Sequence, residues 1–79
     1  MNLYLLTQKL LTKYDVYDSC VVAAEDEYNA RYIHPDGGMI GKDRYPTWVD
    51  EPFYVRVELI GTAKEGTEEG VIIGSFNAG

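Results

Sequence analysis

The segment from Val16 to Pro35 restricts this chain to folds in which one short helix packs on a sheet. Its first part, VYDSCVVA at 16–23, is rich in valine and favours a strand. Asp26 can then cap a helix by accepting from the backbone N–H groups two and three positions later, and Pro35 ends it. A helix this short is stable only when it packs on another element. The rest of the chain therefore has to supply a sheet.

Three other segments have the apolar patterns of strands, and together they indicate the fold class. These segments are Asn2–Gln8, Phe53–Gly61 and Gly70–Phe76. We therefore predict an α+β domain: a four-stranded, mainly antiparallel sheet with one short helix, in ββαββ order. A chain of 79 residues is expected to form one such domain, spanning residues 1–79.

The connections complete the predicted topology. We expect Lys9–Asp15 to join the first two strands as a hairpin, and the polar segment Thr62–Glu69, which contains Gly66, to join the last two as a second hairpin. In the third strand, alternation predicts that the side chains at odd positions from Phe53 to Leu59 point inward. His34 is expected in the last turn of the helix, where the carbonyl end favours a positive charge.

The sequence contains one cysteine and one histidine, which are the first candidates for catalysis. Cys20 lies in the middle of a predicted strand and lacks the helix N-terminus or glycine-rich turn that activates a thiol. Asp15 and Asp18 resemble a carboxylate pair, but their spacing on a strand places them on opposite faces, where both are expected to be solvated. We therefore expect neither an enzyme nor a bound metal or cofactor.

The segment from Gly37 to Pro52 is rich in Gly and Pro and indicates a long connection. Tyr45 and Trp48 precede Asp50 and Glu51, and aromatic residues beside acids are typical of a protein-binding loop. We predict these aromatics as candidate anchors for a partner. The alternative is that Trp48 folds back to cover the small core.

Thirteen acids against seven bases give a formal charge of -6, which disfavours direct binding to nucleic acid or to an anionic membrane. Such a field attracts a protein partner with a basic surface, although acidity also serves solubility alone. No apolar run is long enough to span a membrane, and a single cysteine fits a reducing cytoplasm. The predicted protein-binding acids are Asp15, Asp18, Glu25, Asp26, Glu27, Asp36, Asp50 and Glu51.

Three pieces of the sequence, MNLYLLTQ, YDVYDSCVVAAEDEYNARYIHP and GVIIGSFNAG, resemble a group of short, mostly uncharacterised proteins encoded by bacteriophages and prophages. The resemblance covers about half of the chain and carries no catalytic motif. It implies a setting in the cytoplasm of a bacterial host, where small acidic phage proteins include inhibitors of host defence such as anti-CRISPR proteins.

Two classes of function follow. In the first, the protein is a binding-only inhibitor that docks on a basic, nucleic-acid-handling surface of a defence complex, such as a CRISPR effector, and excludes DNA. In the second, it is an accessory protein that binds another protein without mimicking DNA, for example through strand addition at an open sheet edge. Either protein is expected to be a monomer or a weak homodimer.

Overall fold

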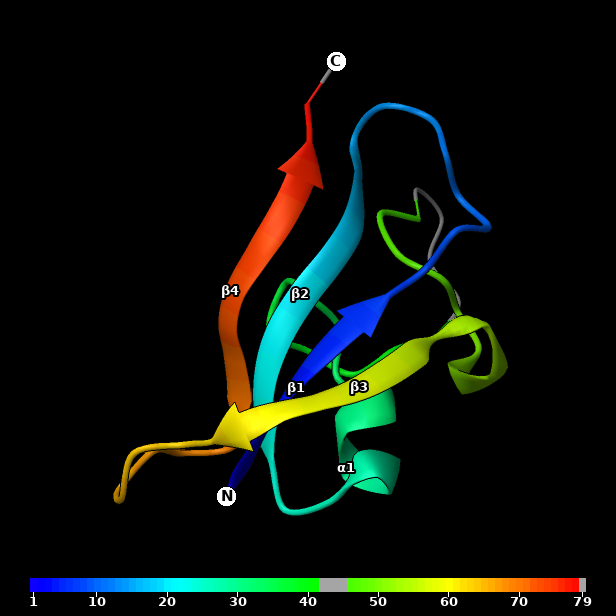
Figure 1. Cartoon of the computed structure of the whole chain (residues 1–79). Helices are drawn as coiled ribbons and strands as arrows, with labels where there is room; N and C mark the ends of the chain where they lie inside the picture. The colour runs from blue at the N-terminus through cyan, green and yellow to red at the C-terminus, as the bar shows by residue number, and fades with distance from the viewer. Residues whose placement is uncertain (42–45, 79) are drawn as a thin grey trace.

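The computed structural model describes residues 1–41 and 46–78 and contains the predicted four-stranded sheet and short helix (Figure 1). All neighbouring strands in the sheet are antiparallel. The α+β prediction is confirmed. The elements are β1 (Asn2–Thr7), β2 (Val16–Ala24), the helix α1 (Glu27–Arg31), the 3₁₀ helix η1 (Pro52–Tyr54), β3 (Arg56–Thr62) and β4 (Gly70–Asn77).

The strand order is β3-β1-β2-β4, which confirms one predicted hairpin and contradicts the other. β1 and β2 pair directly across the Lys9–Asp15 connection. β3 and β4 lie at opposite edges of the sheet and do not pair with each other, although the connection between them contains a turn in which the Lys64 carbonyl accepts from the Thr67 N–H at 3.0 Å (Figure 1). The hairpin prediction failed because β1 and β2 contribute fully buried side chains and occupy the two central positions, which leaves only the edges for the last two strands.

A buried glutamine holds the β1–β2 connection in place. The Gln8 side chain, only 4% exposed, donates from Nε2 to the carbonyl oxygens of Leu11 and Tyr17, each at 2.9 Å. Its Oε1 accepts from the backbone N–H of Leu11 at 2.8 Å. This amide therefore satisfies backbone groups of Leu11 in the connection and of Tyr17 in β2. The connection itself, residues 9–15, contains no glycine.

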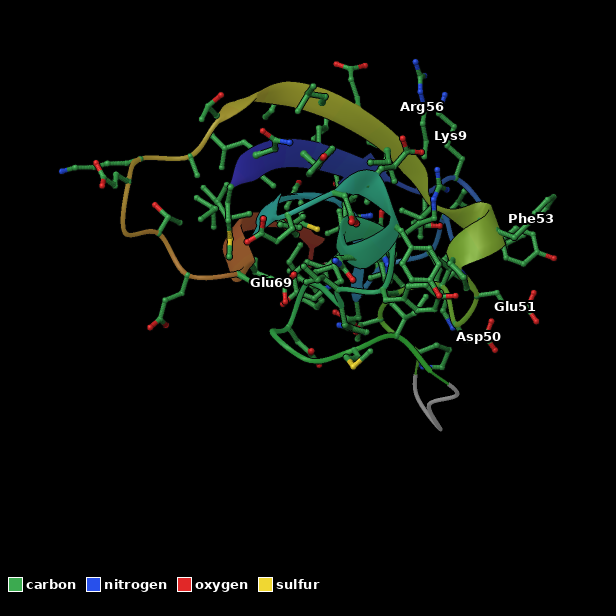
Figure 2. All side chains as sticks on the ribbon, turned by 90° about the horizontal axis from the view of Figure 1, so that it is seen from below. Lys9, Asp50, Glu51, Phe53, Arg56 and Glu69 are labelled. Carbon is green, nitrogen blue, oxygen red and sulfur yellow. The ribbon has the colours of Figure 1, made fainter. Side chains whose placement is uncertain are left out.

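The core lies on one face of the sheet, beneath α1 and the connection that follows it (Figure 2). Leu6 and Val22 project from the central strands and are fully buried, as is Ala30 of the helix. Trp48, from the long connection, is the largest of the fully buried side chains. One small helix and one loop tryptophan therefore cover this face.

The opposite face carries no helix among the described residues, and a row of side chains runs across it from edge to edge. The strand registers place Glu58, Leu5, Val21 and Ile73 side by side on β3, β1, β2 and β4. Ile73 is 66% exposed at the end of this row. The sheet therefore has an open, largely apolar face that ends at the β4 edge.

The start of the third strand differs from the prediction. Pro52 opens η1, and the strand begins only at Arg56, so the expected alternation does not reach Phe53, which is 84% exposed. Val55 is buried as predicted, but Leu59 is 61% exposed. Leu59 lies on an edge strand, and a helix of five residues is too short to cover it.

The helix begins as predicted and ends earlier. Asp26 is its N-cap, and the Asp26 carboxylate accepts from the Asn29 N–H at 2.8 Å. The helix ends at Arg31, so His34 lies beyond it and not in its last turn. His34 instead opens a tight turn: its carbonyl accepts from the Gly37 N–H at 2.9 Å, and the positive φ of 106° at Gly37 favours glycine.

Replacing Asp26 with alanine is expected to lower the free energy of unfolding by about 1 kcal/mol, because the cap bond to Asn29 is lost. Urea denaturation followed by circular dichroism measures this change. Glu25→Ala is the matched control, since Glu25 is exposed and does not cap the helix. Equal stability of the two variants would contradict the cap.

Candidate protein-binding surface

Cys20 and His34 are held in structural positions. Cys20 is buried in β2, and desolvation raises the pKa of its thiol from 9.0 to about 12, which disfavours the thiolate that a nucleophile needs. His34 is also buried, and its Nδ1 accepts from the Asp36 backbone N–H at 3.0 Å. The Tyr17 ring packs edge-on against the imidazole, with centroids 6.4 Å apart. Within the described residues no three His, Cys, Asp or Glu side chains come together to hold a metal.

The raised pKa of Cys20 predicts a loss of stability at alkaline pH. The unfolded thiol ionises near pH 9.0 and the folded thiol only near 12, so folding stability is fully present below pH 9 and falls as pH rises toward 12. The slope from this group alone is about 1.4 kcal/mol per pH unit. Cys20→Ala should lack this part of the decline, and urea denaturation between pH 8 and 10.5 compares the two proteins. If the free energies of unfolding of the two proteins changed in parallel with pH, a buried neutral thiol would be contradicted.

The structure describes one of the two predicted aromatic anchors, Trp48. Trp48 is 2% exposed and belongs to the core, so its side chain is not available to a partner in this fold. The alternative interpretation of Trp48, as a loop residue that covers the core, is therefore the correct one. Its indole Nε1 is buried and has no hydrogen-bond partner among the described residues. Tyr45 lies outside the described residues.

All eight predicted acids are exposed, but they do not form one continuous face. Asp15 and Asp18 lie at the start of β2, while Glu25 follows its end. A strand of nine residues spans roughly 30 Å, so these acids are at opposite ends of the molecule. The predicted acids therefore separate into groups.

Several of these acids also stabilise local structure. Glu27 pairs with Arg31 at 2.7 Å, and the Arg31 guanidinium also donates to the carbonyl oxygen of Val55 at 2.5 Å. Asp36 accepts from the Gly38 N–H at 3.0 Å within the turn after the helix. Arg31 therefore joins α1 to η1 and is already engaged by an acid.

Beside the helix the side chains form an open cleft of about 320 Å³, which we call the tyrosine cleft. Tyr28 and Tyr32 form one wall, with their ring centroids 5.3 Å apart and their planes tilted by 56°. Hydrogen bonding to Tyr28 raises the pKa of Tyr32 above its ordinary value of 10.0. The cleft is lined by Tyr28, Asn29, Tyr32, Ile33, Met39 and Glu69.

The tyrosine cleft lies in acidic surroundings. Glu25, Asp26 and Glu27 immediately precede Tyr28, and all three are exposed. Asp36 begins the turn that leads to Met39, and Glu68 precedes Glu69. Glu69 itself is a lining residue from a distant part of the sequence, just before β4. Of these acids Glu69 lines the cleft, and the others are exposed residues close in sequence to its lining residues.

A second group of acids and aromatic residues lies around η1. Asp50, Glu51 and Phe53 project outward at one end of the molecule, far from Glu69 (Figure 2). Phe53 packs edge-on against Tyr54, with ring centroids 5.4 Å apart. Lys9 and Arg56 lie at this same end (Figure 2). This η1 surface thus carries charges of both signs, unlike the acidic rim of the tyrosine cleft.

Sequence reasoning missed the tyrosine cleft. Tyr28 and Tyr32 are four positions apart on a helix, a spacing that places two side chains next to each other and was available as a signal. Glu69 carried no such signal, because only the order of strands in the sheet brings the start of β4 beside the helix.

Comparisons with known proteins leave the resemblance to phage proteins as a hypothesis. No protein-family model, curated protein or solved structure matches this chain. Among the described residues, no helix has both the length and the apolar character needed to cross a membrane.

Proposed function

We propose that this protein is a binding-only inhibitor that acts in the cytoplasm of a bacterial host. Its acidic surface around the tyrosine cleft docks on a basic, nucleic-acid-handling surface of a defence complex, with a CRISPR effector as the first candidate, and excludes DNA from that surface. The proposed partner is a protein. The inhibitor binds neither nucleic acid nor membrane directly.

The observation that carries this proposal is the exposed Glu69 side chain in the lining of a cleft with two tyrosines, with further exposed acids close in sequence to the lining residues. Aromatic side chains bury much area on binding at low cost in conformational entropy, and the acids around them complement a basic partner. The formal charge of -6 adds long-range attraction to such a partner and repulsion of nucleic acid. Burial of the Cys20 thiol, with its raised pKa, disfavours Cys20 as a nucleophile.

Capture from a bacterial lysate tests this proposal. The tagged protein, immobilised on beads, is expected to retain a nucleic-acid-handling protein from a strain that carries a CRISPR system, and raised salt should release it because exposed charges are screened. The variant Glu25→Lys/Glu68→Lys is the control for binding through the acidic rim. Retention that is independent of both salt and these two acids would contradict the proposal.

The β4 edge favours a second candidate function, that of an accessory protein that binds by strand addition. β4 lies at an edge of the sheet, and Gly70–Asn77 contains no charged residue. Charged residues are a common means of blocking an open edge. Ile72 and Ile73 are 51% and 66% exposed on this strand. If Ile72→Lys abolishes capture while the Glu25→Lys/Glu68→Lys variant retains the partner, this second function is the correct one.

A further inference from the structure

The tyrosine cleft has the components of a site for a single cationic side chain. Tyr28 is 68% exposed, so much of its ring is accessible, and Met39 is 76% exposed on another part of the lining. Ile33 is only 9% exposed and provides an apolar base. Among the described residues, Glu69 is the one lining side chain with a formal charge.

These components select the charge of the ligand. The face of an aromatic ring attracts cations through its quadrupole, and the Glu69 carboxylate pairs with a positive group and repels a negative one. The acids that precede Tyr28 and Glu69 in the sequence act in the same direction. Met39 and Ile33 suit the aliphatic stem that carries the charge of a long basic side chain.

We propose that the tyrosine cleft receives the guanidinium group of an arginine from the partner, with that group against the Tyr28 ring and paired with Glu69. A guanidinium is planar, stacks on aromatic rings and pairs with a carboxylate through two parallel hydrogen bonds, whereas an ammonium group is compact and strongly hydrated. This inference deepens the proposed function and rests on it only for the identity of the protein that supplies the arginine.

A titration with a small probe tests the cleft without any partner protein. N-acetyl-arginine amide, added to the ¹⁵N-labelled protein, is expected to give saturable chemical-shift changes at Tyr28, Asn29, Tyr32, Met39 and Glu69. The citrulline analogue has nearly the same shape and no charge, and it should give changes at least several-fold smaller at equal concentration. Equal binding of citrulline, or arginine shifts centred on Asp50 and Glu51 instead, would overturn the proposal.

Two variants and a matched control assign the contacts. Tyr28→Leu keeps an apolar side chain without a ring, and Glu69→Gln keeps the shape without the charge; each is expected to weaken arginine binding about two- to fivefold. Glu51→Gln removes one exposed charge at the η1 surface and should leave the affinity unchanged. The exposed positions predict unchanged thermal midpoints for all three variants. Equal weakening by Glu69→Gln and Glu51→Gln would show a response to overall charge alone and contradict a built site.

The two hypotheses fail separately. If arginine binds in the cleft but no basic partner is captured from lysates, the site stands and the proposed function is wrong. If a basic partner is captured and released by salt, while the arginine probe does not bind or Tyr28→Leu has no effect on its binding, the proposed function stands and the arginine site is wrong.

Discussion

Trp48→Ala is expected to lower the free energy of unfolding by about 3–5 kcal/mol, the largest effect of any single substitution considered for this protein. Trp48 is 2% exposed and packs in the core cluster with residues of the sheet and the helix. Small domains have total stabilities of only about 5–15 kcal/mol. The variant should therefore be partly unfolded at 37 °C, which urea denaturation followed by far-UV circular dichroism measures.

Trp48→Phe is the matched control, because it keeps an aromatic ring in the core and removes the indole N–H that has no partner among the described residues. We expect it to cost far less stability than Trp48→Ala. Because the chain has one tryptophan, the tryptophan fluorescence of the unmodified protein reports on this site alone. Acrylamide should quench this fluorescence poorly. A stable Trp48→Ala variant, together with strong quenching, would place Trp48 at the surface and restore its role as an anchor.

Reversal of two exposed acids that lie close in sequence to lining residues of the tyrosine cleft is expected to slow association with the captured partner by on the order of tenfold. Glu25→Lys/Glu68→Lys changes the formal charge from -6 to -2, since each reversal adds two charges. Both residues are exposed, and neither forms an ion pair within the described part of the chain. Glu27 is less suitable, because its reversal would also break the pair with Arg31.

Asp50→Lys/Glu51→Lys is the matched control, with the same change in charge at the η1 surface. It is expected to slow association less, because these acids lie at the other end of the molecule from Glu69 (Figure 2). Raising the salt from about 0.1 M to 1 M shortens the screening length from about 10 Å to 3 Å and should slow association of the unmodified protein. Surface plasmon resonance measures these rates. Equal effects of the two double variants would show that overall charge, and not the tyrosine cleft, directs binding.

The parts of the fold that depend on local chemistry could be predicted from the sequence. Asp26 caps the helix through its own short side chain as expected, although the helix ends at Arg31, ahead of the stop expected at Pro35. The β1–β2 hairpin was also predicted, although its stabilising contact, the buried Gln8 amide, was not. Each of these features involves residues close together in the sequence.

The parts that depend on long-range packing could not be predicted in the same way. Adjacent strands with a glycine between them suggest a hairpin, but the β3-β1-β2-β4 order separates the last two strands. Burial of Trp48 and the meeting of Tyr28 and Glu69 in one cleft both follow from this tertiary arrangement. None of the residues that line the tyrosine cleft, including its acid Glu69, was among the predicted site residues.

Competition with DNA tests the central claim most directly. The affinity of the captured partner for duplex DNA would be measured without this protein and at a series of increasing concentrations of it. If the acidic surface occupies the nucleic-acid site, the apparent Kd for DNA should rise in proportion to the concentration of the protein, and Glu25→Lys/Glu68→Lys should weaken the effect. A ternary complex with unchanged affinity for DNA would contradict the claim that this protein excludes DNA from its partner.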